Sequence, residues 1–253
     1  MTAVAIFGAT SAIAERVARL YAQDGARLFL VGRDGERLEA IAADLGVRGA
    51  TEVATFAADL NDEASLAAAL GAYDAAGGAD VALIAFGTLG DQAASEADRA
   101  HARRELLTNF VSPVCLLTEL ANRFEARGRG GRVAGGGGVI AVITSVAGVR
   151  GRRSNYVYGA AKAGLSAFLE GLRHRLHGRG VAVLDVRPGF VDTPMTAHLP
   201  KGGPLWASPE RVAADIHAAI AKRRAVLYTP WFWRWIMAVI RLLPRPLFHR
   251  LDI

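Results

Sequence analysis

Near its start the chain reads Ala3-Val4-Ala5-Ile6-Phe7-Gly8-Ala9-Thr10-Ser11-Ala12-Ile13-Ala14. The first five of these residues are continuously apolar and include Val, Ile and Phe, which is typical of a short buried strand. A turn of small residues follows at once, and helical spacing begins near Glu15. The stretch therefore predicts a strand, a tight turn and a helix, which is the first unit of an α/β fold.

The same alternation continues along the chain. Short apolar runs recur, and most are separated by stretches with helical spacing, such as Leu38 to Leu45 and Ser65 to Tyr73. Continuous apolar strands separated by helices indicate a parallel sheet covered on both faces, and right-handed crossovers then give a doubly wound, Rossmann-type sheet. We therefore expect one α/β domain over residues 1–229 with about seven parallel strands, near residues 3–7, 27–31, 51–56, 80–86, 138–144, 181–186 and 225–228.

The composition agrees with a single domain that has a large core. Hydrophobic residues make up 52% of the 253 residues, and no Pro- or Ser-rich linker divides the chain. The glycine-rich run 128–138 predicts a flexible surface loop. The one cysteine, Cys115, cannot form an internal disulfide, so we expect a small buried side chain in a protein of the reducing cytoplasm. No basic region precedes the first apolar run, so no signal peptide is expected.

The positive charge is concentrated near the C-terminal end. From Lys222 onward the chain has seven basic residues and one acidic residue, which accounts for the whole net charge of +6. A nucleic-acid-binding domain typically carries its basic residues as a patch or stripe on the folded domain. Because the charge here belongs to an apolar tail, we expect no nucleic-acid partner.

That tail, residues 230–253, predicts an amphipathic C-terminal helix. Thr229 is a suitable N-cap, Pro230 a suitable first helical residue, and Pro244 would end the helix. About thirteen residues span roughly 20 Å, too short for a bilayer core of about 30 Å. Two arginines seven residues apart share one face near three tryptophans. The helix is expected either to lie flat on a membrane surface, on its cytoplasmic side, or to pack on the substrate cleft or a partner subunit.

The turn after the first strand suits a phosphate group. A short turn at a helix N-terminus offers free backbone N–H groups and the positive end of the helix dipole, and both favour an anion. We therefore expect this turn to bind the pyrophosphate of a dinucleotide through Gly8, Thr10, Ser11 and Ile13.

A candidate acid–base site lies in the middle of the chain. Tyr158 and Lys162 are four residues apart, so a helix places them on one face. A free tyrosine, with a pKa near 10, is a poor acid–base catalyst near pH 7. The ammonium of Lys162 and the charge of an oxidised nicotinamide are expected to lower the pKa of Tyr158. Ser145 ends an apolar strand thirteen residues upstream, where its hydroxyl can hold the reacting oxygen.

These motifs, in this order, resemble those of the short-chain dehydrogenases over about residues 3–228. The turn resembles the T-G-x-x-x-G-x-G signature of that family with Gly8 as its first glycine, although Ala12 and Ala14 replace the other two. The resemblance implies a nicotinamide-dependent oxidoreductase whose catalytic residues are Asn109, Ser145, Tyr158 and Lys162, the last two also contacting the cofactor.

The resemblance implies further cofactor contacts. Asp59 matches the residue at the adenine ring, and Gly87 is what remains of the family's N-N-A-G motif after the fourth strand. The segment Arg187-Pro188-Gly189-Phe190-Val191-Asp192-Thr193-Pro194 resembles the family's P-G motif. The contacts expected from it come from Pro188, Gly189, Val191 and Thr193, with the Val191 backbone at the nicotinamide carboxamide.

The second strand indicates the cofactor. An NAD site usually places a carboxylate at this strand tip, whereas NADP needs a cation for its 2′-phosphate. The tip here is Gly32, and Arg33 is next, so we expect NADP, with NAD as the alternative because Asp34 could bind a ribose.

We therefore expect an enzyme that transfers a hydride between NADP and a carbonyl or alcohol, with a lipophilic or lipid-linked substrate, no metal site and a homo-oligomeric assembly. The turn at Gly8, the segment 85–91 and the basic aromatic tail are also similar to the decaprenylphosphoryl keto-pentose reductases. The alternative is a non-catalytic dinucleotide-binding module that docks on a membrane or partner, and the presence of all four catalytic residues argues against it.

Overall fold

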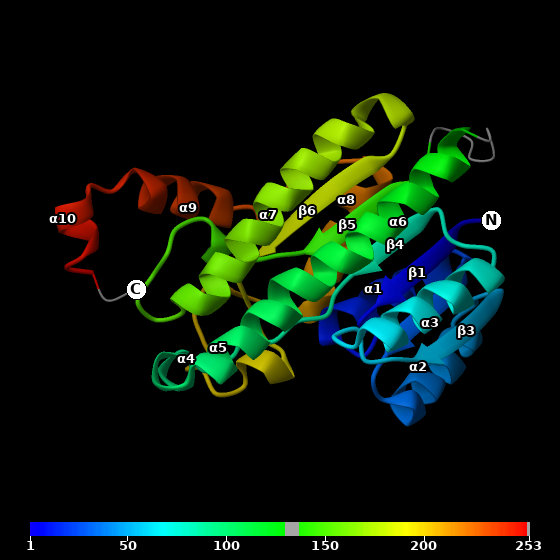
Figure 1. Cartoon of the computed structure of the whole chain (residues 1–253), viewed down its shortest axis with the longest axis horizontal. Coiled ribbons are helices and arrows are strands. Elements are labelled where there is room, and N and C mark those ends of the chain that lie inside the picture. Colours follow the sequence, from blue (N-terminus) through cyan, green and yellow to red (C-terminus); the bar gives the residue numbers. More distant parts are fainter. Residues whose placement is uncertain (130–136, 252–253) are drawn as a thin grey trace.

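The computed structural model describes residues 1–129 and 137–251, and its centre is one parallel sheet (Figure 1). The strand order is β3-β2-β1-β4-β5-β6-β9, which is the expected doubly wound order. The expected strands are confirmed within two residues at each end. They are β1 Ala3–Phe7, β2 Arg27–Gly32, β3 Glu52–Ala57, β4 Val81–Ile84, β5 Val139–Ile143, β6 Ala182–Pro188 and β9 Val226–Thr229.

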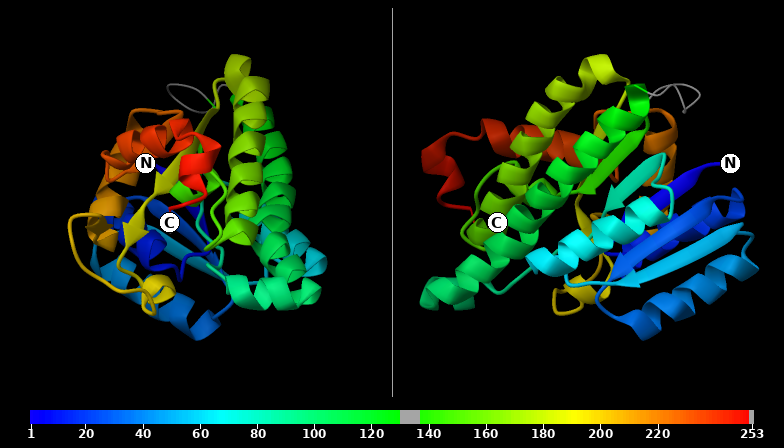
Figure 2. Two further views of the ribbon diagram at one scale, coloured as in Figure 1. Left: turned by 90° about the vertical axis from the view of Figure 1, so that its left-hand side faces the viewer. Right: turned by 45° about the vertical axis from the view of Figure 1, so that its right-hand side comes forward.

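Helices cover both faces of the sheet, as the two views of Figure 2 show. One face is covered by α1 Ala12–Gln23, α2 Gly35–Val47 and α8 Pro209–Ala221. The other is covered by α3 Glu63–Ala75, α6 Ser112–Arg129 and α7 Tyr156–Leu176. Residues 130–136 of the predicted glycine-rich loop lie outside the described residues.

The sheet has two cores because successive side chains of a strand point to opposite faces. Along β1, Val4 and Ile6 join the core beneath α1 and α8, and Ala5 and Phe7 join the core beneath α3 and α6. All five residues of β1 are buried, which explains why its sequence is continuously apolar.

The carboxyl ends of the strands form one edge of the sheet, and the longest connections leave from it. After β4 the chain forms α4 Gln92–Ala97, α5 Arg99–Leu106 and a π-helical turn, Leu107–Val111, that leads into α6. After β6 two short strands, β7 Phe190–Val191 and β8 Trp206–Ala207, pair with each other. The apolar runs did not predict this two-stranded ribbon.

The C-terminal helix begins later than predicted. Thr229 is not an N-cap: it ends β9, and its buried hydroxyl donates a hydrogen bond to Asp215 at 2.7 Å. The helix α9 covers Trp233–Leu242 and is followed by α10, Arg245–Phe248. No helix among the described residues is long and apolar enough to cross a membrane.

The expectation of a buried Cys115 was wrong, because its side chain is exposed on α6. The apolar stretch around it is one face of an amphipathic helix, and the leucines at 116, 117 and 120 occupy the buried positions.

Candidate active site

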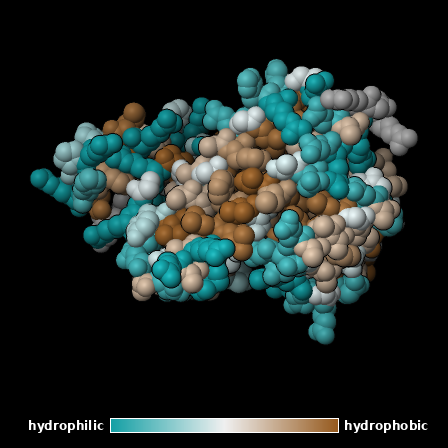
Figure 3. All heavy atoms as spheres, in the orientation of Figure 1, coloured by the Kyte–Doolittle hydropathy of each residue, from teal (hydrophilic) through white to brown (hydrophobic). Residues whose placement is uncertain are grey.

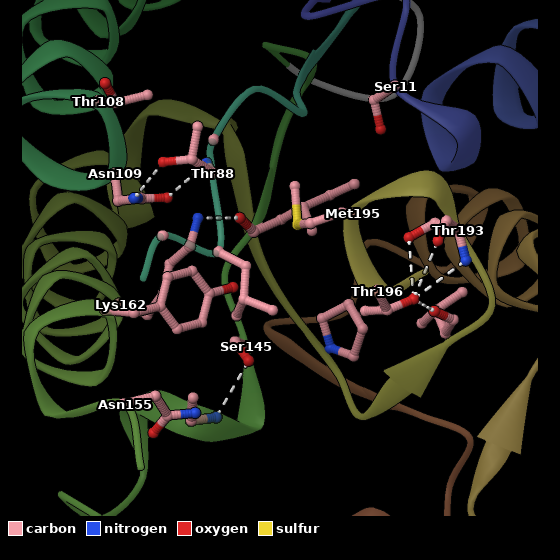
Figure 4. A pocket seen from close by; sticks show the side chains of 18 of the residues that line it. Ser11, Thr88, Thr108, Asn109, Ser145, Asn155, Lys162, Thr193, Met195 and Thr196 are labelled. Carbon is pink, nitrogen blue, oxygen red and sulfur yellow. Dashed lines mark hydrogen bonds between the residues drawn. The ribbon is translucent and has the colours of Figure 1, made fainter. Parts of the chain in front are cut away.

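A cleft of about 1340 Å³ runs along the carboxyl edge of the sheet. Its walls include every residue expected to bind substrate or cofactor, among them Gly8 of the first turn and Lys162. Figure 4 shows Thr88, Asn109, Ser145 and Lys162 on one side of the cleft and Thr193, Met195 and Thr196 on the other.

Three residues expected to be catalytic meet in this cleft. Ser145 follows β5, and its Oγ accepts a hydrogen bond from the backbone N–H of Ala147 at 3.1 Å. Tyr158 and Lys162 lie in the first two turns of α7. The Lys162 Nζ donates to the carbonyl of Ile143, the last residue of β5, at 3.3 Å and lies 5.7 Å from the centroid of the Tyr158 ring. A strand end and a helix start thus bring together residues far apart in the sequence.

Burial controls the protonation of two of these groups. Burial raises the pKa of Tyr158 to about 12; the Ser145 hydroxyl and the charge of Arg152 oppose the increase, whereas Glu105 adds to it. Burial also lowers the pKa of Lys162 to about 8, although Asp185 acts in the other direction.

The expected lowering of the Tyr158 pKa is therefore wrong for the protein alone, because loss of solvation outweighs the neighbouring charges. The part of that expectation that concerns the nicotinamide charge stays a prediction.

Asn109 lies in the π-helical turn and is fully buried. Such turns are frequent at functional sites. Its Oδ1 accepts from the backbone N–H of Thr88 at 3.1 Å, and its Nδ2 donates to the Glu105 carbonyl at 3.1 Å. A Cβ placed on Gly87 would lie 2.8 Å from Asn109 Oδ1 and 3.3 Å from Lys162 Nζ. Only glycine at 87 therefore leaves room between the asparagine and the lysine.

Glu105 belongs to this group although the sequence motifs did not indicate it. Its carboxylate accepts a hydrogen bond from the Thr88 hydroxyl at 2.9 Å and one from Asn109 Nδ2 at 3.2 Å. Its spacing of four residues from Asn109 is the signal that could have found it, because a helix places both on one face.

The other end of the cleft fits a dinucleotide. Gly8 has a φ of +89°, and a Cβ there would lie 2.6 Å from the backbone nitrogen of Phe86, so a side chain cannot be accommodated. Ser11 is the N-cap of α1, and its side chain makes no capping hydrogen bond, so it does not occupy the first-turn N–H groups. Ala12 lines the cleft, and Ala14 is buried in the core.

The tip of β2 carries a free cation. Arg33 is exposed, lines the cleft and forms no hydrogen bond or ion pair with any residue that the structure describes. Asp34 is the N-cap of α2 and accepts the backbone N–H of Arg37 at 3.0 Å. The Arg37 side chain lines the same part of the cleft, a contact that the motifs did not indicate.

The remaining expected cofactor residues also line the cleft. Asp59 accepts a hydrogen bond from the backbone N–H of Asn61 at 3.0 Å. Val191 is buried in the short strand β7, and the Thr193 backbone N–H donates to the Thr196 hydroxyl at 3.2 Å. Pro188 ends β6, and Gly189 connects it to β7.

The C-terminal helix α9 forms one wall of the cleft through Trp233, Ile236 and Ile240. A Cβ on Gly189 would lie 1.9 Å from Trp233 Nε1, so the indole occupies the space beside this glycine. Trp233 and Met237 are buried against Val146, one residue after Ser145. The tail thus packs on the cleft, one of the two arrangements expected for it.

Comparison with known proteins identifies a matching family, related sequences and similar solved structures. The short chain dehydrogenase family matches residues 2–203. An uncharacterised oxidoreductase of Mycobacterium tuberculosis (strain H37Rv) is 43% identical, with 98% of this chain and 96% of the relative aligned. An oxidoreductase of Streptomyces coelicolor is 39% identical over 98% and 95% of the two chains. Among solved structures, an actinorhodin polyketide ketoreductase with NADPH is 25% identical, with a TM-score of 0.76 over 90% of this chain and 95% of the ketoreductase.

Proposed function

This chain belongs to the short-chain dehydrogenase family of oxidoreductases, and from that premise we propose that it is an NADP-preferring enzyme that interconverts a carbonyl and an alcohol on a lipophilic substrate. The observation that carries this proposal is the convergence of Ser145, Tyr158 and Lys162 in one cleft whose other end fits a dinucleotide.

The protein residues have distinct roles in this proposal. NADP(H), when bound, supplies or accepts the hydride. The Ser145 hydroxyl holds the substrate oxygen, and the Tyr158 hydroxyl donates its proton to that oxygen during reduction. The raised pKa of Tyr158 keeps this proton in place at neutral pH. Lys162, with a pKa of about 8, can return a proton to the tyrosine. By resemblance to the family, Asn109 would support a water-mediated proton path to this lysine. A non-catalytic module would not need this arrangement.

Preference for NADP is supported by the β2 tip. Asp34 uses one carboxylate oxygen as a helix cap, which leaves one oxygen for a ribose hydroxyl in the NAD alternative. Arg33 and Arg37 both reach the cleft there, where a 2′-phosphate would lie. The ketoreductase at 25% identity, whose structure contains NADPH, agrees with this preference.

A lipophilic substrate is supported by the apolar wall beside the catalytic group. Ile236 and Ile240 of α9 line the same cleft as Met195 and Leu205. The test is NADPH oxidation with 2-ketones of increasing chain length. We expect kcat/KM to rise with each added methylene, and to fall in an Ile240→Ser variant for long ketones more than for acetone. Equal kcat/KM values for all chain lengths would contradict the lipophilic assignment.

The outer face of α9 supports docking on an anionic membrane. Trp235, Val239 and Leu242 lie on one helical stripe with exposures of 62%, 62% and 81%. Arg234 and Arg241 are exposed beside them. Each basic residue near an anionic surface contributes about 1 kcal/mol, and inserted apolar side chains add to it.

Co-sedimentation with phosphatidylglycerol vesicles at low salt tests this docking. We expect binding by the intact chain, weaker binding at high salt, and a loss of most binding in a Trp235→Ala/Leu242→Ala variant. The control is Val47→Ala, an exposed apolar residue on α2. If the intact chain stays in the supernatant, membrane docking is refuted.

The outer faces of α6 and α7 support contact with a second copy of this chain. Apolar side chains gather over these helices in Figure 3. A shallow hollow of about 330 Å³ lies there between Thr118 and Phe168. Analytical ultracentrifugation of a Phe168→Arg variant tests this contact, and an unchanged oligomer would refute it.

A further inference from the structure

We propose that the substrate part of the cleft contains a binding site for an anionic group, a carboxylate or a phosphate, formed by Arg152 together with Asn155 and Trp233. The inference rests on the proposed function, because it assigns the class of substrate that the catalytic group acts on. The expected substrate therefore has an acidic head group, and its remaining part contacts the apolar cleft wall formed by α9.

Arg152 is the cation that this site requires. It lies in the loop between Ser145 and Tyr158, lines the cleft, and has a buried Nε without a hydrogen-bond partner. Within residues 1–129 and 137–251 it forms no ion pair either. A guanidinium taken from water without a counter-charge is costly, and burial accordingly lowers the pKa of Arg152. An anionic ligand would supply the missing charge.

Two further polar atoms of the cleft wall lack a partner. They are the Asn155 Oδ1, three residues from Arg152, and the Nε1 of Trp233, whose side chain is only 4% exposed. Figure 4 shows Asn155 beside Ser145. Unsatisfied buried polar atoms are rare in proteins, and three that line one cleft indicate a polar ligand. Arg152 and Trp233 can donate to the oxygens of an acid group, and Asn155 can accept from a hydroxyl next to it.

None of the three carboxylates that line the cleft, Asp59, Asp91 and Glu105, forms an ion pair with Arg152 in the part of the chain that the structure describes. Asp91 accepts the backbone N–H of Ala94 as the N-cap of α4, at 3.0 Å. Glu105 is hydrogen-bonded to Thr88 and Asn109. The unpaired positive charge is therefore available to a ligand.

The position of Arg152 assigns the anion to the substrate rather than to the cofactor. The dinucleotide end is marked by Gly8 and Arg33. Arg152 instead acts on Tyr158, because its positive charge opposes the increase in the Tyr158 pKa that burial causes. An anion bound there lies close to the reacting carbonyl. We therefore expect a keto acid or a keto phosphate, or the corresponding hydroxy compound.

Two matched pairs of carbonyl compounds test the site. Benzoylformate is compared with its methyl ester, and dihydroxyacetone phosphate with dihydroxyacetone, each with NADPH. We expect the wild type to prefer the anionic member of at least one pair by tenfold or more in kcat/KM, and the pair that shows the preference identifies carboxylate or phosphate. Arg152→Gln should remove that preference, lowering kcat/KM for the anionic member at least tenfold more than for the neutral member. Arg152→Lys should retain part of it.

The control is Arg224→Gln, which removes one charge at an exposed position after α8. It should leave both members of each pair unchanged. Equal kcat/KM for anionic and neutral members in the wild type, or a preference that survives Arg152→Gln, would overturn the proposal.

A binding measurement keeps this test independent of turnover. The melting temperature of the NADP⁺-saturated protein is measured with benzoylformate and with inorganic phosphate. We expect at least one of these anions to raise it in the wild type and in Arg224→Gln, and to have no effect in Arg152→Gln. If no ketone is reduced but the anion still stabilises only proteins with Arg152, the proposed reaction fails and the anion site stands. If neither anion stabilises the wild type, the site is refuted. Should Arg152→Gln not fold, Asn155→Ala is used instead, with weaker stabilisation by the same anion expected.

Discussion

Replacing Lys162 by methionine should abolish activity and at the same time stabilise the fold. The Lys162 side chain is 4% exposed, and burial lowers its pKa from 10.5 to about 8. A lysine with a lower pKa in the folded state binds its proton less tightly there than in the unfolded chain. The charge therefore opposes folding, fully below pH 8, and the effect disappears as the pH rises through 10.5.

The magnitude follows from the pKa difference. At about 1.36 kcal/mol per pKa unit, the buried charge costs about 3 kcal/mol of unfolding free energy at pH 7. Methionine removes this cost but also removes the hydrogen bond to the Ile143 carbonyl, which contributes about 1 kcal/mol. The net gain is about 2 kcal/mol, or a rise of about 4–8 °C in melting temperature for a chain of this size. At pH 9.5 the charge costs only about 1 kcal/mol, so the gain should be close to zero.

The assay is urea denaturation of wild type and Lys162→Met at pH 7.0 and pH 9.5, with NADPH oxidation measured in parallel. Lys222→Met is the control, because Lys222 is exposed at the end of α8 and should show no such pH-dependent gain. If Lys162→Met is less stable than wild type at pH 7, or its gain is the same at both pH values, Lys162 is not held in the low-dielectric environment described above.

Three further substitutions test the site. Tyr158→Phe should lower kcat by at least a hundredfold while NADPH binding, followed by fluorescence, stays unchanged; near wild-type turnover would exclude the acid–base role. Arg33→Ala should raise the Kd of NADPH by about tenfold to a hundredfold, as loss of a charged hydrogen bond predicts, and leave that of NADH unaltered; equal wild-type affinities for both cofactors, by titration, would refute the NADP preference. Gly189→Ala should displace Trp233 and lower both melting temperature and kcat/KM, because the new Cβ would lie 1.9 Å from the indole nitrogen; unchanged values would mean that α9 does not depend on this contact.

The sequence predicted those features that depend on local pattern. Continuous apolar runs located the strands because a sheet covered on both faces needs apolar residues at every position. The four-residue spacing of Tyr158 and Lys162 located two candidate catalytic residues because helix geometry fixes which residues share a face. The turn of small residues beginning at Gly8 indicated the phosphate turn, and the structure gives a reason for this glycine, because a side chain there would clash with Phe86.

Features created by tertiary contacts were not predicted. Arg152 lies between two other basic residues in the sequence, at 150 and 153, and only the folded loop turns it into the cleft. Thr229 has the composition of a helix cap, yet its pairing with Asp215 draws it into β9. The pKa of Tyr158 is raised, although the sequence led us to expect a lowered value. The reason is burial, which disfavours the charged phenolate and whose extent cannot be seen in the sequence.

The two arrangements considered for the tail, packing on the cleft and binding a membrane, are compatible because they use different faces of α9. Trp233, Ile236 and Ile240 of α9 contact the cleft, while Trp235 and Val239 on the same helix remain exposed. Trp233 also packs on the Gly189 turn, so the helix connects the exposed stripe to the segment expected to hold the nicotinamide. A membrane bound to the outer stripe would therefore lie one helix diameter, about 10 Å, from the cleft. An amphiphilic substrate could keep its apolar chain along α9 and place its acidic head at Arg152, next to Tyr158. The cost of burying Arg152 is thus expected to be offset when the acidic head of such a substrate binds, because a carboxylate or phosphate supplies the counter-charge that Arg152 lacks.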